Sequence, residues 1–502
     1  MREERGRNGK TGACVKRKPV RLLVSVNGQT GRIPRFGGKR SVGISGAGRP
    51  PTFMHRKAAL MLFALVTGLV GAAHLIAGEL TLTHFLNVLD PDARAAAFRR
   101  LDQNWSAGLV APLLELNSLV SDRDLSGRTF ALLQKKTGQT LGTDGDAWYR
   151  WVWSTASDPP PWYADFKATL YAGIDERFAE YFRDRPKAII RLDEIRWGGV
   201  RRDGIPPLDH PTMLAAGEAS YLADSDVVFG VSIKGEARAY PKRILAWHEM
   251  VRDRIGGEEF NGVYCTLCGS MILYRTTIGG KHYELGTSGF LYRSNKLMYD
   301  RDTKSLWSTI EGEPAVGPLV GRGLKLEALS VVTTTWGEWR GRHPDSKVLS
   351  LATGYRRDYS EGAAYRDYFA TDELMFIVPG SDARLRNKAE ILALRFGSDT
   401  ERPVAIAQRL LVKRPIYQGK HGGMDYVVLT DRTGANRVYE SGGETFDRLS
   451  PTGVTAHDGT EWRLTEAALT SPDGRRRDRL PAHRAFWFGW HAAHPDTRLV
   501  DE

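Results

Sequence analysis

Cysteine is scarce in this chain, with only three among 502 residues. Cys14 lies in a basic leader, so Cys265 and Cys268 are the only cysteines in the rest of the sequence. One such pair excludes the multiple-bridge framework of a small disulfide-rich secreted protein. It also excludes a structural zinc site made of four cysteines. Any thiol chemistry in the main body of the chain must therefore use Cys265 and Cys268.

The short motifs of several common enzyme classes are also missing. The sequence contains no Walker A motif, no Gly-rich dinucleotide fingerprint, no His-Glu-x-x-His helix and no serine-hydrolase elbow. These absences argue against common nucleotide-dependent and peptidase chemistries. The formal net charge is +12, but Met1–Lys57 contributes much of it. No recognition motif accompanies that charge, so nucleic acid is not an expected partner.

The N-terminal part has two sections of different composition. Residues 1–53 are rich in Arg, Gly and Lys without helical or strand periodicity, which predicts disorder. From Met54 a short basic start leads into an apolar run over 58–77, and residues 54–78 together are typical of a signal peptide or membrane anchor. We interpret Met54 as the true start of synthesis. Uncleaved, residues 58–77 would contact the membrane, and the remainder would be exported, periplasmic or otherwise extracytoplasmic.

The rest of the chain predicts an α+β protein with two regions of different texture. Apolar residues recur at three- and four-residue steps over 90–185, which predicts a helical region. Over 190–502, short β-branched and aromatic runs alternate with Gly, Asp and Asn turns, which predicts a β-rich domain. A protein partner on the helical region is a further expectation, because stacked helices usually serve as scaffolds.

An internal echo indicates that the β-rich region is duplicated. Residues 326–350 and 479–500 each carry an aromatic pair, then His-Pro-Asp and an apolar end. We therefore predict two half-domains, at about 200–352 and 374–501, that pack as a pseudo-twofold pair. The second half lacks cysteine, so chemistry is expected in the first.

Several motifs occur in a fixed order from Trp197 onward: WGGVRRDGIPPLDHP, GEARAYPKRILAWHEMV, VYCTLCGSM, GTSGFLYRSNKLMYDRDTKSLWS and TWGEWRGRHPDSKVLS. In this order they resemble the bacterial family named domain of unknown function 3179, whose members are exported or membrane proteins. Thr266 stands where that family usually has proline between its two cysteines. Residues 137–153 are similar to a turn in HEAT-like helical regions joined to the family. The resemblance points to the positions in these motifs, but it implies no particular reaction.

Three readings of the Cys-x-x-Cys pair remain open at this level: metal binding, a structural disulfide and thiol exchange. A strand before Cys265, a left-handed turn at Gly269 and a strand after it would form a metal knuckle. Zinc or copper would then need a further ligand. His248 is the leading candidate, followed by His282 and His343.

Acid–base chemistry is a further reading of the same region. His248 and Glu249 end a predicted helix, and either could act as an acid or base. Asp300 could orient a base and Arg301 could bind an anion. The structural alternative is that Asp300 and Arg301 form a turn or an ion pair. Our leading hypothesis is an extracytoplasmic Cys-x-x-Cys/His centre for a transition metal or redox chemistry. The alternatives are a non-catalytic binding or scaffold module with a structural disulfide, and an enzyme that uses His248 or Glu249.

The predicted topology can be tested with a reporter enzyme fused after Glu502. The fusion should be active only outside the cytoplasm, because Arg56 and Lys57 should keep the N-terminal side of the apolar run in the cytoplasm. Deleting residues 1–53 should leave export and folding intact. Cytoplasmic activity of the fusion would refute the placement, and loss of export in the truncated chain would show that the leader is needed.

Overall fold

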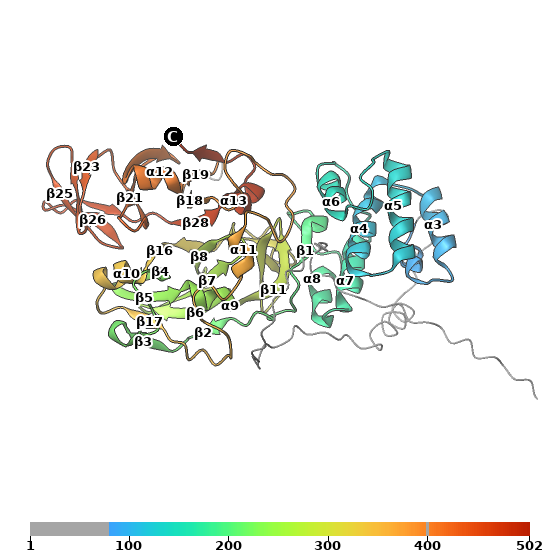
Figure 1. The fold of residues 1–502 in the computed structure, drawn as a ribbon, viewed down its shortest axis with the longest axis horizontal. Helices are drawn as coiled ribbons and strands as arrows, with labels where there is room; N and C mark the ends of the chain where they lie inside the picture. Colours follow the sequence, from blue (N-terminus) through green and yellow to red (C-terminus); the bar gives the residue numbers. More distant parts are fainter. Residues whose placement is uncertain (1–79, 398–400) are drawn as a thin grey trace, which may run out of the picture. The chain divides into compact units, whose positions relative to one another are not determined.

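The computed structural model describes residues 80–397 and 401–502 (Figure 1). The chain divides into two compact units, and the division falls between Thr143 and Asp144. The predicted leader at 1–53 and the apolar run at 58–77 lie outside the described residues. Within the described ranges, we find no helix with the length and apolar character needed to cross a membrane.

The first unit contains helices α2 (Leu82–Leu86), α3 (Arg94–Gln103), α4 (Val110–Leu119) and α5 (Arg123–Thr137). Helical structure thus begins before the predicted start at residue 90, because the Thr81 hydroxyl caps the N-terminus of α2. Asp122 caps α5, and its carboxylate also lies 2.8 Å from the buried guanidinium of Arg94. This ion pair joins α3 to α5.

Three further helices belong to the second unit: α6 (Gly145–Trp153), α7 (Tyr163–Ala172) and α8 (Ala179–Phe182). Aromatic rings of α7 and α8 surround Phe290 of strand β11 (Leu285–Tyr292), with Tyr171 at 4.9 Å and Phe182 at 5.3 Å between ring centres. The chain after residue 190 is rich in strands. The predicted α+β class, helical first and then β-rich, is therefore confirmed.

The first half of the β-rich region contains two five-stranded sheets that hold the cysteines and the repeated motif, and a third that is described below. One has the order β16 (Val332–Thr335), β4 (Val227–Ile233), β5 (Glu236–Pro241), β17 (Lys347–Leu349) and β3 (Met213–Ala215). The other has the order β15 (Glu327–Leu329), β8 (Ser270–Arg275), β7 (Glu258–Cys265), β6 (Met250–Ile255) and β2 (Leu208–Asp209). Helix α9 (Lys242–His248) follows β5, and helix α10 (Trp336–Arg342) follows β16.

The second half repeats the first of these sheets. Its order is β28 (Ala482–Phe486), β18 (Glu390–Leu394), β19 (Val404–Ala407) and β29 (Arg498–Val500), with helices α12 (Gln408–Lys413) and α13 (Trp487–Ala493) in the places of α9 and α10. In both sheets the first two pairings are antiparallel and the third is parallel. The first-half sheet has one further, antiparallel pairing, between β17 and β3. The indole N–H of Trp339 donates to Ser346 at 2.9 Å, and that of Trp490 donates to Thr497 at 2.9 Å. The repeated sequence segments thus fold into the same local structure.

Further sheets complete the second unit. The strands β1 (Ile195–Trp197), β11, β12 (Asn295–Asp300), β13 (Leu306–Ser308) and β14 (Pro314–Val316) form one, and β20 (Ile416–His421), β21 (Met424–Thr430) and β22 (Asn436–Glu440) form another. A third contains β23 (Phe446–Leu449), β24 (Gly453–Ala456), β25 (Glu461–Leu464), β26 (Ala468–Thr470) and β27 (Arg476–Asp478), and β9 (Thr277–Ile278) pairs with β10 (Lys281–His282).

The two halves share one hydrophobic core. Val263 and Ile272 of the first half belong to the same buried cluster as Ile391 and Ile406 of the second. Burying these faces against each other removes apolar surface from water, which is the main favourable contribution to folding. Without the other half, either half would expose part of this core to water.

Gly230 provides a test of this packing. A Cβ atom there would lie 2.2 Å from the buried ring of Trp339, so we expect Gly230→Ala to lower the free energy of unfolding by at least about 2 kcal/mol. At Gly341, in α10, a Cβ would meet nothing within 4 Å, so Gly341→Ala should raise stability by up to about 1 kcal/mol. Chemical denaturation of both variants measures the difference, and equal effects would contradict the packing described.

Candidate functional site

The two cysteines lie in the turn that joins β7 to β8. Cys265 ends β7 and pairs with Ser270, the first residue of β8. The Cys268 amide donates to the Cys265 carbonyl at 3.1 Å, and Gly269 adopts the left-handed conformation with φ of 61°. The predicted strand, left-handed turn and strand are therefore confirmed.

Elements of the second half hold this turn in place. The amide of Phe486, at the end of β28, donates to the Cys268 carbonyl at 2.7 Å. The Phe486 ring lies so close to Gly269 that a Cβ there would be 2.9 Å from it. A Cβ on Gly489, in α13, would lie 3.1 Å from the Cβ of Cys268. A side chain larger than hydrogen at Gly269 or at Gly489 would therefore crowd the contact between the cysteine turn and the second half.

Both thiols are free and buried, with Cys265 3% exposed and Cys268 fully buried. The Cys268 thiol donates to the Ser294 carbonyl at 3.3 Å. Burial raises the pKa of Cys268 well above its usual value. Burial is the largest influence on Cys265 and acts in the same direction, but the polar contacts with Cys268 and with the backbone of Lys296 and Cys268 together outweigh it and lower the pKa of Cys265. Cys265 is therefore the more acidic thiol and the better nucleophile at neutral pH.

A buried ion pair lies beside the thiols. The Lys296 ammonium is 2.5 Å from a carboxylate oxygen of Glu249, and these side chains are only 7% and 8% exposed. The Tyr365 hydroxyl donates to the other oxygen at 3.1 Å. The negative charge of Glu249 raises the pKa of Tyr365, so this phenol stays protonated. The Tyr264 amide donates to the Glu249 carbonyl at 2.9 Å, which fixes Glu249 next to the residue before Cys265.

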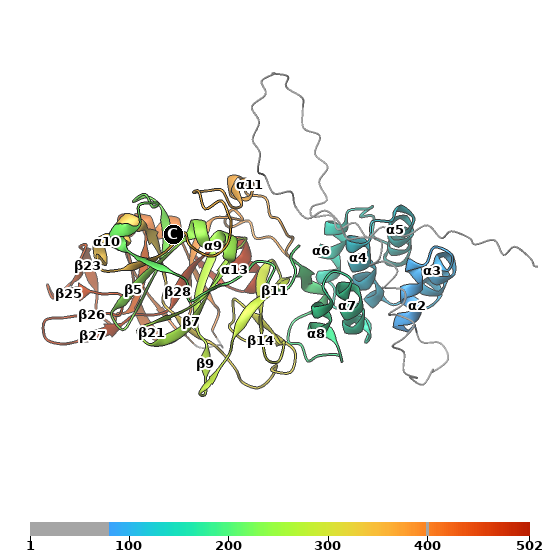
Figure 2. The ribbon, with the colours of Figure 1, turned by 90° about the horizontal axis from the view of Figure 1, so that it is seen from below.

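Residues 351–388, which we call the covering segment, shield the thiols. This segment contains α11 (Arg366–Ala370), which lies beside α9 in both views (Figures 1 and 2). The Tyr368 hydroxyl donates to the Leu267 carbonyl at 2.7 Å, inside the cysteine turn. Tyr368, Cys265 and Cys268 belong to one hydrophobic cluster. A molecule that reacts with either sulfur must therefore displace part of this segment.

His248 has other partners than the cysteines. Its Nδ1 is 2.9 Å from the Pro206 carbonyl oxygen, and its Nε2 is 2.6 Å from the Tyr359 hydroxyl. Burial lowers the pKa of His248, which favours the neutral ring. Over residues 80–397 and 401–502, we find no group of three or more His, Cys, Asp or Glu side chains placed to hold a metal ion. His282 instead contacts Thr276, and His343 faces Glu466.

Asp300 and Arg301 take structural positions. The Asp300 carboxylate accepts hydrogen bonds from the amide and the hydroxyl of Thr303, both at 2.7 Å, in the turn after β12. Arg301 forms ion pairs with Asp203 at 3.1 Å and Glu284 at 3.0 Å. Asp300 thus forms a turn, as in the structural alternative, whereas Arg301 pairs with Asp203 and Glu284 and not with Asp300.

Lys296 and Tyr365 were missed by the sequence reasoning. The only signal for Lys296 was a cation within a strand where neighbouring positions are apolar, since every residue of β12 is buried. Tyr365 lies in the covering segment, far along the chain from Glu249, and no periodic pattern marks it.

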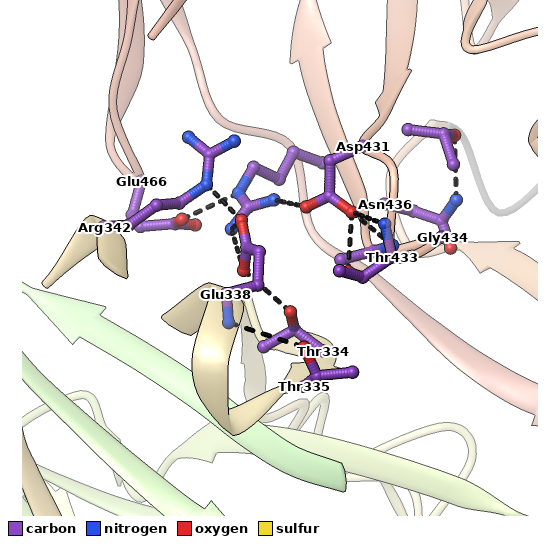
Figure 3. A network of polar contacts seen from close by, with 12 residues as sticks. Thr334, Thr335, Glu338, Arg342, Asp431, Thr433, Gly434, Asn436 and Glu466 are labelled. Carbon is purple, nitrogen blue, oxygen red and sulfur yellow. Dashed lines mark hydrogen bonds and ion pairs between the residues drawn. The ribbon is translucent and has the colours of Figure 1, made fainter. Parts of the chain in front are cut away.

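The second half carries an ion-pair network where the first half carries the cysteines (Figure 3). The turn between β21 and β22 corresponds to the cysteine turn. The Arg437 guanidinium, 1% exposed, lies 3.0 Å from Asp431, 2.7 Å from Glu466 and 3.3 Å from Glu338. Glu338 occupies the same place in α10 that Gly489 occupies in α13, two residues after the first tryptophan. Each half therefore packs its turn against a helix of the other half.

Together these features define a duplicated α+β unit with a buried dithiol in one of its two equivalent turns. The chain belongs to the family described as Protein of unknown function (DUF3179), which it matches over residues 202–497. This match includes both halves and the cysteine turn. Neither the curated proteins nor the solved structures contain a significant match to the chain.

The Arg437 network predicts a large loss of stability on removing its cation. Arg437→Leu would remove the buried cation that three carboxylates share, so we expect a loss of about 3 kcal/mol in the free energy of unfolding. Glu338 and Glu466 would keep Arg342 and Arg479, whereas Asp431 would lose the cation it pairs with. The matched control is Arg448→Leu, which removes a pair exposed by 74% and 73% and should change stability by less than about 1 kcal/mol. Thermal and urea denaturation measure both effects, and similar values would contradict the role of the network.

The network also predicts a pH dependence. Burial opposes it, but the positive charge of Arg437 lowers the pKa of Glu466 well below its usual value. The unfolded chain therefore binds this proton first as the pH falls, so the network stabilises the fold at neutral pH and loses this contribution below about pH 4. Arg437→Leu should flatten that part of the stability profile.

Proposed function

We propose that Cys265 and Cys268 form a reversible dithiol–disulfide centre and that this protein acts in thiol redox chemistry outside the cytoplasm. The observation that carries the proposal is the pairing of two free, buried thiols in one turn, with the Cys268 thiol bonded to the Ser294 carbonyl and a buried ion pair nearby. Unequal acidity separates an attacking sulfur from a resolving one.

The arrangement favours redox chemistry over a closed metal site. Structural zinc takes four ligands, and a catalytic zinc takes three from the protein. Cys265 and Cys268 supply two, while both ring nitrogens of His248 face Pro206 and Tyr359. A purely structural disulfide is also less favoured. The turn is already fixed by the strand pairing and by the Phe486 amide, and a bridge across so short a loop restricts the unfolded chain little.

The chemistry follows from the order of acidity. In the reduced protein, the Cys265 thiolate attacks a disulfide, forms a mixed disulfide with one half and releases the other half as a thiol. Cys268 then attacks the Cys265 sulfur, closes the intramolecular disulfide and releases the second thiol. The protein loses two electrons and two protons, which the substrate disulfide accepts as it becomes two thiols.

Location and partners complete the proposal. Residues 54–78 would export the chain or anchor it through 58–77, which would place the cysteines in an oxidising compartment where disulfides persist. The helical region over residues 90–185 would serve as the surface that recruits a protein partner. The covering segment would open when a substrate reaches the turn.

The redox proposal can be tested with full-length protein in which Cys14→Ser leaves only the proposed centre. In graded mixtures of oxidised and reduced dithiothreitol, we expect both thiols to disappear together in one two-electron transition. Intact mass and thiol counting follow the change. With an excess of oxidised glutathione, Cys268→Ser should accumulate a mixed disulfide at Cys265, whereas Cys265→Ser should react far more slowly.

Two results would overturn this proposal. A pair that stays reduced throughout the titration and retains a bound metal would favour the metal reading. A disulfide that resists strong reductant in the native state, with no effect on structure when it forms, would favour the structural reading. Metal analysis on the same preparation distinguishes them.

A further inference from the structure

The Glu249–Lys296 pair requires an explanation that stability does not provide. Removing two charges from water costs several kcal/mol per ion, and apolar residues of similar volume often stabilise a fold equally well. Yet both side chains are less than one-tenth exposed. The Glu249 carbonyl accepts from the amide of Tyr264, the residue before Cys265, and the charge of Glu249 acts to raise the pKa of both thiols. Buried charges of this kind are common where a reaction needs a proton acceptor.

We propose that Glu249 accepts and returns the proton of thiol exchange, and that Lys296 is the charge partner that makes this transfer feasible. The inference rests on the redox function proposed above and assigns roles to two residues that are not themselves redox-active. Glu249 is the general base, and Lys296 and Tyr365 are positioning residues.

Charge conservation is the physical reason. A thiol in a buried turn cannot lose its proton to water without leaving a net charge where the dielectric constant is low. With the ion pair present, the proton can pass from Cys265 to the Glu249 carboxylate. The site then holds a thiolate, a neutral carboxylic acid and the Lys296 ammonium. Its total charge is the same before and after the transfer, so no additional net charge is buried.

Three segments of the backbone bring these groups together. Glu249 adopts a left-handed conformation with φ of 55°, which costs energy for a residue with a side chain. In this conformation it ends α9, and its carbonyl accepts from the Tyr264 amide next to Cys265. Lys296 belongs to β12, two residues after Ser294, whose carbonyl accepts from the Cys268 thiol. The structure therefore connects each charge of the pair to one of the two cysteines.

The other ionisable groups around the pair are consistent with this role. Tyr365 donates to Glu249 and holds the carboxylate in place. Tyr264 is fully enclosed, and burial raises its pKa, so its phenol stays neutral. Glu390 acts on Tyr264 through space. Within the described part of the chain, these groups leave Lys296 as the cation in contact with Glu249.

The proton path is balanced over one exchange. The Cys265 S–H bond breaks and its proton bonds to a Glu249 oxygen, while the sulfur attacks the substrate disulfide. The S–S bond of the substrate breaks, and the leaving sulfur takes the proton from Glu249. In the second half of the reaction, Cys268 gives its proton to the same carboxylate, and the second leaving thiol receives it.

The test measures the rate at which reduced full-length Cys14→Ser protein reacts with oxidised glutathione under pseudo-first-order conditions. Glu249→Gln keeps the shape but removes the acceptor, so we expect the rate near neutral pH to fall about a hundredfold or more. Lys296→Met should cause a similar fall, because an unpaired buried carboxylate takes up its own proton. Glu249→Asp should restore part of the rate.

The pH profile separates catalysis from folding. Hydroxide can replace a missing base, so the rate of Glu249→Gln should approach that of the parent protein at alkaline pH. A variant that had lost its structure would expose both thiols and would not show the slow reaction expected at neutral pH. Glu327→Gln, a surface carboxylate 60% exposed and paired with Arg275, is the matched control and should react like the parent. Circular dichroism confirms that each variant is folded.

The outcomes distinguish this inference from the redox proposal. A Glu249→Gln protein that is folded and reacts as fast as the parent, or faster, would overturn the role of Glu249. If the parent itself forms no disulfide, the redox proposal fails, and the same variants are then compared by the rate of Cys265 alkylation with iodoacetamide. A slower alkylation of Glu249→Gln would still support proton transfer to Glu249, and an equal rate would overturn it.

Discussion

The packing of each half's central turn against a helix of the other half is the contact on which the second unit depends. Cys268 meets Gly489 of α13, and Arg437 meets Glu338 of α10. Both contacts sit at the edge of one shared core that contains strands of both halves. Because interiors are close-packed, a change at either turn is transmitted to the opposite half. The duplication therefore produces one cooperative unit.

The two equivalent turns contain different side chains. The second-half turn contains Asp431 next to the buried Arg437, and its ion pairs reach α10 of the first half. The first-half turn contains two thiols, and a glycine takes the place of the facing glutamate. Glycine leaves room for the sulfurs, whereas glutamate provides charge for the arginine. The second-half turn thus links the halves through its ion pairs, and our proposal assigns the chemistry to the first-half turn.

Burial of the thiol turn has two opposite effects on the sulfurs. The covering segment and Phe486 exclude water from Cys265 and Cys268, which protects the sulfurs from unspecific oxidation. The same exclusion opposes formation of a thiolate. In our proposal, Glu249 and Lys296 resolve this difficulty by keeping a carboxylate and a compensating cation inside the same enclosure. The strained backbone of Glu249 is consistent with a position selected for its side chain.

The sequence by itself determined the order of helical and β-rich regions, the repeat and the cysteine turn. Periodicity, the echo around Trp336 and Trp487, and Gly269 after Cys268 are local signals, and local signals survive without knowledge of the fold. Only the tertiary structure decided the surroundings of the thiols. In the fold, His248 contacts Pro206 and Tyr359, and both Lys296 and Tyr365 contact Glu249. These partners are far apart in the chain, and side-chain pairing between distant strands and loops depends on how the two halves pack, which no local pattern encodes.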